Sequence, residues 1–525
     1  MTVDPADLEG LAERVRGTRV AIVGGGMAGL VAALECAKVG IAVTVFEASG
    51  SLGGAVRSAE VAGIRVDVGA ESFATRGGTV RTLVEELGLG DAVVTPAAGG
   101  AWLAGLAASG TGPDAAPLPT GGVLGIPANP WDPAVVRIIG RRAAWRAYLD
   151  RLRPPLTIGI DHSLGHLVRG RMGQVVLDRL VAPVTSGVYS ARPDDIDVEL
   201  AAPGLSAALT RAGSLSGAVA ALRAGAEKAA QCKAPGSAVE GIEGGMSRLV
   251  DAVQARLEAL QVQIRVATPV HALERTGGKW RVVVPEAGDL GESTGIRTPS
   301  PDEPEDDAEI RNDAAGAPGD AAFDAVIVAA PEAVARQLLA PHADLPASAE
   351  SAAPVVEIVT LVVDAPELDA SPRGTGVLTV PGSHIAKALT HSTAKWEWVR
   401  RAAGGAHVVR VSFGAQGEAP ATEGLDDEAA ARLALSEASA LLGVELTALR
   451  GFHRARFVQS QPASVLGRAE FAAGSRAAIR RVEGLGAAGA WLAGTGLAQV
   501  VPDAAAEADR VRAGLLWGGS EPAAD

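Results

Sequence analysis

The sequence predicts an α/β protein whose first domain is built around a dinucleotide-binding βαβ unit. Three observations near the N-terminus predict this class: the apolar run 19–23 leads straight into Gly24-x-Gly26-x-x-Gly29, an alanine-rich helical pattern follows, and a second apolar run, 42–46, ends at Glu47. A glycine pattern of this kind is informative when a strand precedes it and a helix follows it, and both are present here. The alternative is a glycine-rich turn in an α/β protein that binds no dinucleotide.

Each residue of this unit has a physical task. Gly24 permits the tight turn out of the strand, Gly26 lets the backbone approach a pyrophosphate, and Gly29 lets the helix pack closely on the strand. The amides of the helix N-terminus then face the phosphates. Glu47 lies 18 residues after Gly29 (47 minus 29), where a ribose-binding acid is expected. The residues predicted to contact the dinucleotide here are Gly24, Gly25, Gly26, Met27, Ala28, Gly29, Glu47 and Ala48.

The composition limits the partners and the compartment. The formal net charge of −14 argues against a nucleic-acid partner, because such a partner requires a basic face. No run of 18 uncharged apolar residues is present, and residues 1–16 are charged and helical in pattern rather than signal-like. We therefore expect a cytoplasmic protein without a transmembrane segment.

Cysteine and histidine usage predicts no metal site. Neither Cys36 nor Cys232 has a CxxC partner, and Cys36 falls in the first helix, where we expect a buried small apolar residue. His162 and His166 have the i, i+4 spacing of a metal pair, but no acid follows the first histidine as in HExxH. We instead predict Ser163 as the N-cap of a helix.

The segment after the βαβ unit is predicted to be mostly helical. A helix is expected at 79–89, closed by Gly90, and a loose hairpin at 96–119. Residues 131–148 alternate apolar residues with arginines, and further helices extend to about Gln231. A basic amphipathic helix of this kind lies either on a membrane surface or, as we favour, with a solvated face on a helical subdomain.

The second half of the chain is richer in strand patterns. Residues 285–322 are acidic and nearly free of large apolar residues, which predicts a disordered insertion or a long solvated hairpin. The continuous apolar run 324–331 predicts a buried parallel strand. The remaining expectations are strands at 262–266, 270–274 and 280–284 with a turn at Gly277-Gly278, a β-rich region with helices at 350–482, and a last strand, turn and helix at 488–514.

A second glycine pair follows the acidic residue. Gly53-Gly54 and then Arg57 come shortly after Glu47, and this arrangement resembles the extension found in FAD enzymes of the amine oxidase and protoporphyrinogen oxidase superfamily. In those enzymes it wraps the second phosphate and the flavin side of the cofactor. The alternative is an ordinary turn followed by a solvated arginine.

Further motifs make the resemblance more specific. Together they resemble the protoporphyrinogen/coproporphyrinogen oxidase family of haem biosynthesis, and particularly its soluble bacterial branch. The segments that carry the resemblance are 69–76 (GAESFATR), 87–91 (LGLGD), 118–127 (LPTGGVLGIP), 163–173 (SLGHLVRGRMG), 180–189 (LVAPVTSGVY), 244–250 (GGMSRLV) and 387–396 (KALTHSTAKW).

The resemblance implies a fold. It predicts a Rossmann-like FAD-binding domain interleaved with an antiparallel-sheet substrate domain and a helical subdomain. The expected boundaries are 17–95, 241–345 and 485–518 for the three parts of the FAD-binding domain, with the insertion 285–322 in the second, 96–240 for the substrate-binding helical subdomain, and 346–484 for the sheet.

The resemblance also implies an activity. It predicts oxidation of coproporphyrinogen III to coproporphyrin III by non-covalent FAD, with oxygen as acceptor and hydrogen peroxide as product, and it makes downstream haem-pathway enzymes candidate partners. The flavin carries the chemistry, so no catalytic side chain is required. The alternatives are a protoporphyrinogen IX oxidase, a degenerate flavoprotein that acts as an interaction partner, and an FAD amine oxidase or desaturase. The last of these needs an aromatic cage, for which the 17 aromatic residues offer no visible pair.

By the same resemblance, further residues are assigned to the site. The propionates of a porphyrinogen require cationic partners, for which Arg76, Arg169 and Lys387 are the candidates, with a surface ion pair as the alternative for each. The family's Gly-x-Gly-[Val/Ile]-Pro turn before the last helix is matched to 498–502, where both glycines are lost, and a strand is expected at 490–494. The additional cofactor residues are Gly53, Gly54, Arg57, Gly69, Ala70, Glu71, Ser72, Val270, Phe457, Gly494 and Val501.

Overall fold

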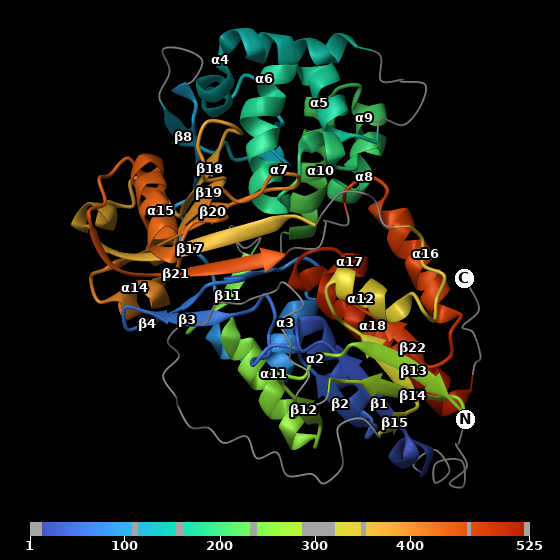
Figure 1. Cartoon of the computed structure of the whole chain (residues 1–525). Coiled ribbons are helices and arrows are strands. Elements are labelled where there is room, and N and C mark those ends of the chain that lie inside the picture. The colour runs from blue at the N-terminus through green and yellow to red at the C-terminus, as the bar shows by residue number, and fades with distance from the viewer. Residues whose placement is uncertain are drawn as a thin grey trace.

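The computed structural model describes residues 13–107, 114–153, 162–230, 239–285, 321–347, 353–458 and 464–518. Its lower part in Figure 1 holds the predicted dinucleotide-binding sheet. The sheet has the order β12-β2-β1-β16-β22, and all of its neighbouring strands are parallel. Its strands are β1 (Arg19–Val23), β2 (Ala42–Phe46), β12 (Gln263–Arg265), β16 (Ala325–Val328) and β22 (Leu485–Ala487).

Both faces of this sheet are covered, which explains its continuous apolar strands. In β1, Val20 and Ile22 face one hydrophobic core, and Ala21 and Val23 face another. Helices α2 (Met27–Lys38), α11 (Ser247–Ala259) and α18 (Leu497–Trp517) contribute to the first core. Side chains of five further elements contribute to the second core: α12 (Glu332–Leu339), α16 (Arg468–Arg480), β13 (Ala272–Thr276), β14 (Lys279–Val283) and β15 (Ala322–Phe323).

A seven-stranded sheet lies beside the parallel sheet (Figure 1). Its neighbouring strands pair antiparallel except β18 and β7, which are parallel, so the sheet is mixed. Helix α15 (Asp427–Leu442) packs on one face, and β3, β4 and α14 pack on the other. In order across the sheet the strands are β21 (Ala448–Val458), β17 (Val355–Asp364), β20 (His407–Phe413), β19 (Ala388–His391), β18 (Gly376–Thr379), β7 (Ala101–Ala104) and β8 (Ala115–Pro117).

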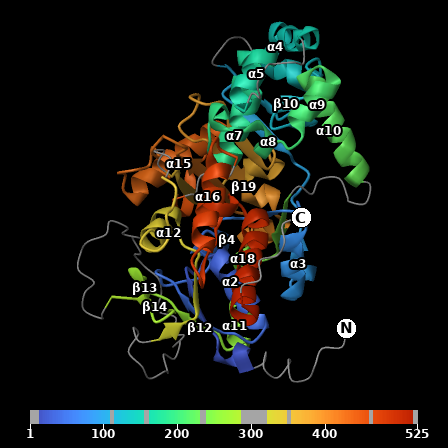
Figure 2. The same ribbon diagram turned by 90° about the vertical axis from the view of Figure 1, so that its right-hand side faces the viewer.

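The helical subdomain stands above both sheets, as Figures 1 and 2 show. Its core is formed by aliphatic side chains from helices that follow one another in the chain. Among the described residues no single helix is long and apolar enough to cross a membrane, and α9 with α10 meets that test only as a pair bent by 117°. The helices are α4 (Pro133–Tyr148), α5 (Leu164–Met172), α6 (Gln174–Val176), α7 (Ala182–Tyr189), α8 (Val198–Ala201), α9 (Leu205–Ala212) and α10 (Leu215–Ala230).

Shorter elements join these units. Strand β11 pairs with both β5 and β6, and β3 pairs with β4. Their bounds are β3 (Ser58–Val61), β4 (Ile64–Asp67), β5 (Phe73–Ala74), β6 (Val93–Val94), β9 (Gly122–Val123), β10 (Ile126–Pro127), β11 (Val239–Ile242), α3 (Thr79–Glu86), α13 (Ser392–Lys395), α14 (Glu397–Ala403) and α17 (Ala490–Ala493).

Two predicted elements are wrong in detail. The helix expected at 79–89 ends at Glu86, because Gly88 adopts a left-handed φ of 75° that a helix cannot continue through. The strand expected at 490–494 is the short helix α17, and the strand lies earlier, at Leu485–Ala487. A short apolar run does not distinguish strand from helix by its pattern alone.

The domain boundaries also shift. Helix α16, expected in the sheet domain, packs through Phe471 and Ile479 into the core of the parallel sheet. Strands β7 and β8, expected in the helical region, pair with each other as the predicted hairpin but belong to the seven-stranded sheet. Most of the acidic insertion, residues 286–320, lies outside the described residues.

Candidate functional site

The predicted glycines form a tight structure that we call the glycine cradle, Gly24–Gly29 together with Gly53 and Gly54. A Cβ on Gly29 would lie 1.8 Å from the carbonyl oxygen of Gly24, so no side chain fits there. The backbone N–H of Gly53 donates to the carbonyl of Gly25 at 2.9 Å, and this contact brings the two glycine segments together. Gly26 is the N-cap of α2 and has no side chain with which to cap it. The cradle therefore exposes uncapped helix amides to an anion.

Glu47 lies at one end of the cradle. Its Oε2 accepts a hydrogen bond from the Gly25 N–H at 2.6 Å, and its Oε1 accepts from the Ser49 N–H at 2.8 Å. The backbone carbonyl of Glu47 accepts from the Thr268 N–H at 2.8 Å, which places the segment leading to Val270 beside it. Ala48 is exposed next to this acid. The structure thus brings together the residues assigned to adenosine, although Glu47 itself is partly satisfied by protein donors.

Arg57 and Gly69 lie at the other end of the cradle. The Arg57 carbonyl accepts from the Gly69 N–H at 3.2 Å, and the Ala70 N–H donates to the Ala55 carbonyl at 2.9 Å. A Cβ on Gly69 would lie 3.3 Å from Cζ of Phe457, so β21 of the seven-stranded sheet reaches this point. The Arg57 Nε is buried without a hydrogen-bond partner. A buried donor of this kind calls for an acceptor.

Glu71 holds two cations that the sequence analysis did not single out. Its carboxylate accepts from Lys395 Nζ and, at 2.8 Å, from Arg410 Nη1. Burial opposes the charge of Glu71, but these two cations outweigh it and lower its pKa to about 2. Ser72 lies next to Glu71 and is partly buried. The only available signals were a lysine within the 387–396 motif and an arginine interrupting the apolar strand 407–413.

The turn before the last helix lies earlier in the chain than predicted. Gly494 and Gly496 adopt φ values of 97° and 104°, and Gly496 is the N-cap of α18. Residues 498–501 lie inside the helix, where no glycine is needed. The Gly-x-Gly-apolar turn is therefore Gly494–Leu497, and the glycines predicted as lost are present four residues earlier. The side chains of Val501, Met27 and Ala28 lie in the hydrophobic core, so only their backbones are available to a cofactor.

The three candidate substrate residues differ in their surroundings. Arg76 is exposed. Arg169 donates to Asp194 Oδ2 at 2.8 Å and to Gln174 Oε1 at 2.9 Å, which corresponds to the surface ion pair of the alternative interpretation. Lys387 directly precedes β19 and is partly buried, its Nζ donates to Ser190 Oγ at 2.7 Å, and burial lowers its pKa to about 8.

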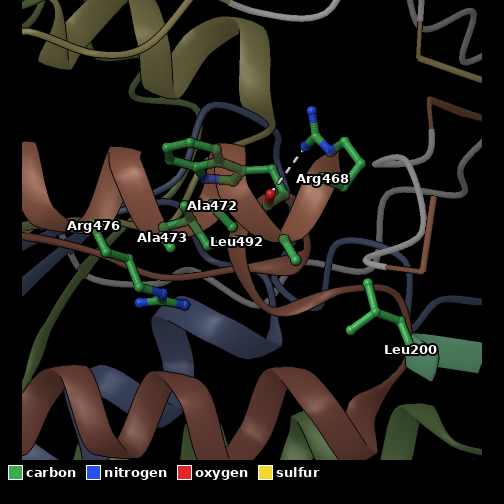
Figure 3. A pocket seen from close by; sticks show the side chains of 8 residues that line it. Leu200, Arg468, Ala472, Ala473, Arg476 and Leu492 are labelled. Atoms are coloured by element: carbon green, nitrogen blue, oxygen red, sulfur yellow. Dashed lines mark hydrogen bonds between the residues drawn. The ribbon is translucent and has the colours of Figure 1, made fainter. Parts of the chain in front are cut away.

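A cavity of about 290 Å³ lies between α8, α16 and α17 (Figure 3). Two arginines and several apolar side chains line it. Arg468 pairs with Glu332 and donates to the Trp491 carbonyl, and Arg476 pairs with Asp503. Because both arginines are paired and neither belongs to the glycine cradle, we do not assign the phosphates to this cavity.

The described residues contain no cluster of histidine, cysteine and acidic side chains that could hold a metal ion. Ser163 Oγ accepts from the His166 N–H at 3.3 Å, which confirms it as the N-cap of α5. Cys36 is buried, as predicted, and burial raises the pKa of its thiol to about 12. It is inert as a nucleophile at neutral pH.

The match to known families agrees with this geometry. Residues 27–512 match the model of the flavin-containing amine oxidoreductases. The coproporphyrinogen III oxidase of Mycobacterium tuberculosis is 30% identical over 498 residues, covering 91% of this chain and 93% of the relative. The chain belongs to this flavin-containing family, in its protoporphyrinogen and coproporphyrinogen oxidase branch. It is an oxidoreductase with a flavin site.

Other relatives support the same placement. The coproporphyrinogen III oxidase of Propionibacterium freudenreichii is 27% identical, covering 93% of this chain and 90% of the relative. A crystal structure from Exiguobacterium sp. 255-15, described as a protoporphyrinogen oxidase, superposes with a TM-score of 0.74 at 23% identity, covering 95% of this chain and 99% of that one. Cyclohexylamine oxidase of Brevibacterium oxydans gives 0.56 at 13% identity, covering 94% and 98%. These two likenesses show the fold alone.

Proposed function

We propose that the protein oxidises coproporphyrinogen III to coproporphyrin III with non-covalently bound FAD, using oxygen as acceptor and releasing hydrogen peroxide. The observation that carries the proposal is the glycine cradle, with the acid Glu47 at one end and the unpartnered Arg57 Nε at the other. The names of the relatives at 27–30% identity support the porphyrinogen.

The chain's own residues bind and orient the cofactor. The amides of α2 and the backbone of the cradle receive the pyrophosphate, and Arg57 Nε donates to the flavin side of the molecule. Glu47 and the backbone of Val270 would hold the adenosine, and Gly69–Ser72 would line the riboflavin side. The bound flavin supplies electron acceptance.

A carboxylate of the substrate requires a cation, and Lys387 is the candidate that we favour. The structure pairs it with a hydroxyl rather than with an acid, so its charge is not neutralised by the contact to Ser190. A substrate propionate supplies the anion that a half-buried ammonium favours. Arg76 is the second candidate because it is exposed and close in sequence to Gly69–Ser72, whereas Arg169 is already paired with Asp194.

The test is a direct comparison of two porphyrinogens. The purified protein, reconstituted with FAD, is assayed by porphyrin fluorescence with coproporphyrinogen III and with protoporphyrinogen IX at matched concentration, while peroxide and oxygen are followed. We expect faster oxidation of coproporphyrinogen III, since it offers four propionates instead of two. Faster oxidation of protoporphyrinogen IX would show that the assignment of coproporphyrinogen III as substrate is wrong. A protein that binds no FAD would overturn the whole proposal.

A further inference from the structure

We propose that Lys395 and Arg410, held together by Glu71, form a charge cluster that raises the reduction potential of the bound flavin. This inference rests on the proposed function for the presence of FAD in the cradle. It assigns an electrostatic role to two side chains from the seven-stranded sheet region.

The cluster is largely removed from solvent. The side chains of Lys395, Glu71 and Arg410 are 19%, 13% and 7% exposed. Arg410 lies on β20, and Lys395 ends α13, so both cations come from backbone that belongs to or adjoins the seven-stranded sheet. The ammonium of Lys395 also lies 5.2 Å from the centre of the Trp396 ring, a cation–π contact that fixes its direction.

A chain of hydrogen bonds connects this cluster with the cradle. Gly53 bonds to Gly25, Ala55 accepts from Ala70, and Arg410 Nη2 donates to the carbonyl of Gly69. Glu71 follows directly after Ala70 in the chain. Because adenosine is assigned to the Glu47 end, the electron-accepting ring of a bound FAD would lie at this end of the cradle. The cluster is therefore next to the backbone along which the ring is expected.

The three side chains carry one net positive charge. Two cations face one carboxylate, and Arg410 Nε is buried without a hydrogen-bond partner. Two further charged groups lie nearby: Asp67 receives the Met246 N–H at the start of α11, and Arg57 flanks Gly69 through its backbone. Asp67 adds one negative charge and Arg57 adds one positive charge, so the net charge of the five groups remains positive. Reduction adds negative charge to a flavin, and a positive charge in a region of low dielectric stabilises it.

Two substitutions distinguish a charge effect from a structural one. Lys395→Met removes one positive charge, and Glu71→Gln removes the negative one, so their effects on the flavin have opposite signs. Lys395→Arg retains the charge. Lys38→Met is a matched control, because Lys38 is 24% exposed and pairs with Glu35 at 2.6 Å, but it ends α2 about 16 Å along the helix from the cradle.

The measurements are the midpoint potential of the bound FAD against a reference dye and the dissociation constant of sulfite, which adds to oxidised flavin and leaves negative charge on the ring. We expect Lys395→Met to lower the potential and to weaken sulfite binding by about tenfold. We expect Glu71→Gln to raise the potential and to strengthen sulfite binding, Lys395→Arg to retain the wild-type values, and Lys38→Met to change neither.

Several outcomes overturn the proposal. If Lys395→Met gives the same potential as Lys38→Met, or if Lys395→Met and Glu71→Gln shift the potential in the same direction, the cluster has no such electrostatic role. The assignment then fails while FAD binding and porphyrinogen oxidation stand. If the wild-type protein binds no FAD, the proposed function fails and this inference fails with it. Should Glu71→Gln not fold, the contrast between Lys395→Met and Lys395→Arg still decides.

Discussion

The two ends of the candidate site are built in different ways. The phosphate end is made of backbone: Gly24 and Gly29, which leave no room for a Cβ, and helix amides with no side-chain cap. The groups that we assign to the flavin ring and to the substrate are side chains paired across distant segments, Glu71 with Arg410 and Lys387 with Ser190. The first end therefore depends on shape and tolerates no added atom, whereas the second depends on charge and tolerates conservative exchange.

The largest effect is expected at Gly29. In Gly29→Ala the added Cβ meets the Gly24 carbonyl at 1.8 Å, which forces helix and turn apart. We expect FAD binding to be lost, measured by flavin content and by fluorescence titration. Gly514→Ala in α18 is the control, because a Cβ there has no neighbour within 4 Å. That variant should bind FAD normally and melt slightly higher, since alanine favours a helix. Equal FAD affinity in both variants contradicts the account of the cradle.

Glu47 is the acidic side chain that we assign to the adenosine end of the cradle. Glu47→Ala removes a carboxylate that bonds both to Gly25 and Ser49 and, by assignment, to the ribose. We expect FAD affinity to fall by about 1 to 3 kcal/mol, the range for a hydrogen bond to a charged group. Glu86→Ala on α3, which loses only a surface pair with Lys38, serves as the control. Wild-type affinity in Glu47→Ala shows that the ribose assignment is wrong.

The same difference explains what the sequence could predict. Backbone requirements leave a local signature, so Gly24, Gly26, Gly29 and Glu47 were predicted in the right strand, turn and helix. Pairs such as Glu71 with Arg410 join residues 339 positions apart, and no local pattern predicts which arginine turns inward. The last turn shows a third case. A motif matched by its proline pointed to 498–502, while the positive φ values lie at Gly494 and Gly496.

The sheet next to the ring end contains a pair of buried histidines that we expect to limit stability in acid. His391 is fully buried, its Nε2 lies 3.2 Å from His407 Nδ1, and burial together with His407 lowers its pKa to about 3. Below pH 6.5 His391 is protonated in the unfolded state but stays neutral in the folded state. The free energy of unfolding therefore falls as the pH decreases from 6.5 toward 3. We expect about 1 kcal/mol per pH unit in that window.

Urea unfolding between pH 4 and 7 measures this dependence. His391→Gln removes the titrating ring, and its stability should fall less steeply with decreasing pH than that of the wild-type protein. His162→Gln is the control, because His162 is exposed on the helical subdomain beside Asp197. Parallel slopes in wild-type protein and His391→Gln show that other groups cause the acid sensitivity.

Lys387 tests whether the substrate end depends on charge. Lys387→Met should raise KM for coproporphyrinogen III several-fold and leave the flavin spectrum unchanged, a loss of substrate binding rather than of chemistry. In the wild-type enzyme, KM should also rise as pH passes about 8, where this lysine loses its proton. The increase with pH should be absent in Lys387→Met. Arg76→Ala is expected to raise KM as well, but without removing the pH dependence near 8. If the rise of KM near pH 8 persists in Lys387→Met, a group other than Lys387 causes it.

The smallest effect is expected from the acidic insertion, which belongs to neither end of the site. Strands β14 and β15 flank it and pair directly, with Arg281 opposite Ala322, so the two ends of the segment are already close together. Replacing residues 286–320 by a short glycine-serine linker leaves this pairing in place and changes the closure entropy only slightly. The segment contains few large apolar residues and so contributes little buried area. We expect soluble yield, melting temperature, FAD content and turnover to stay close to those of the full chain. A collapse of yield, or a fall in FAD content like that of Gly29→Ala, would show that the insertion packs against the parallel sheet and supports the cradle from outside.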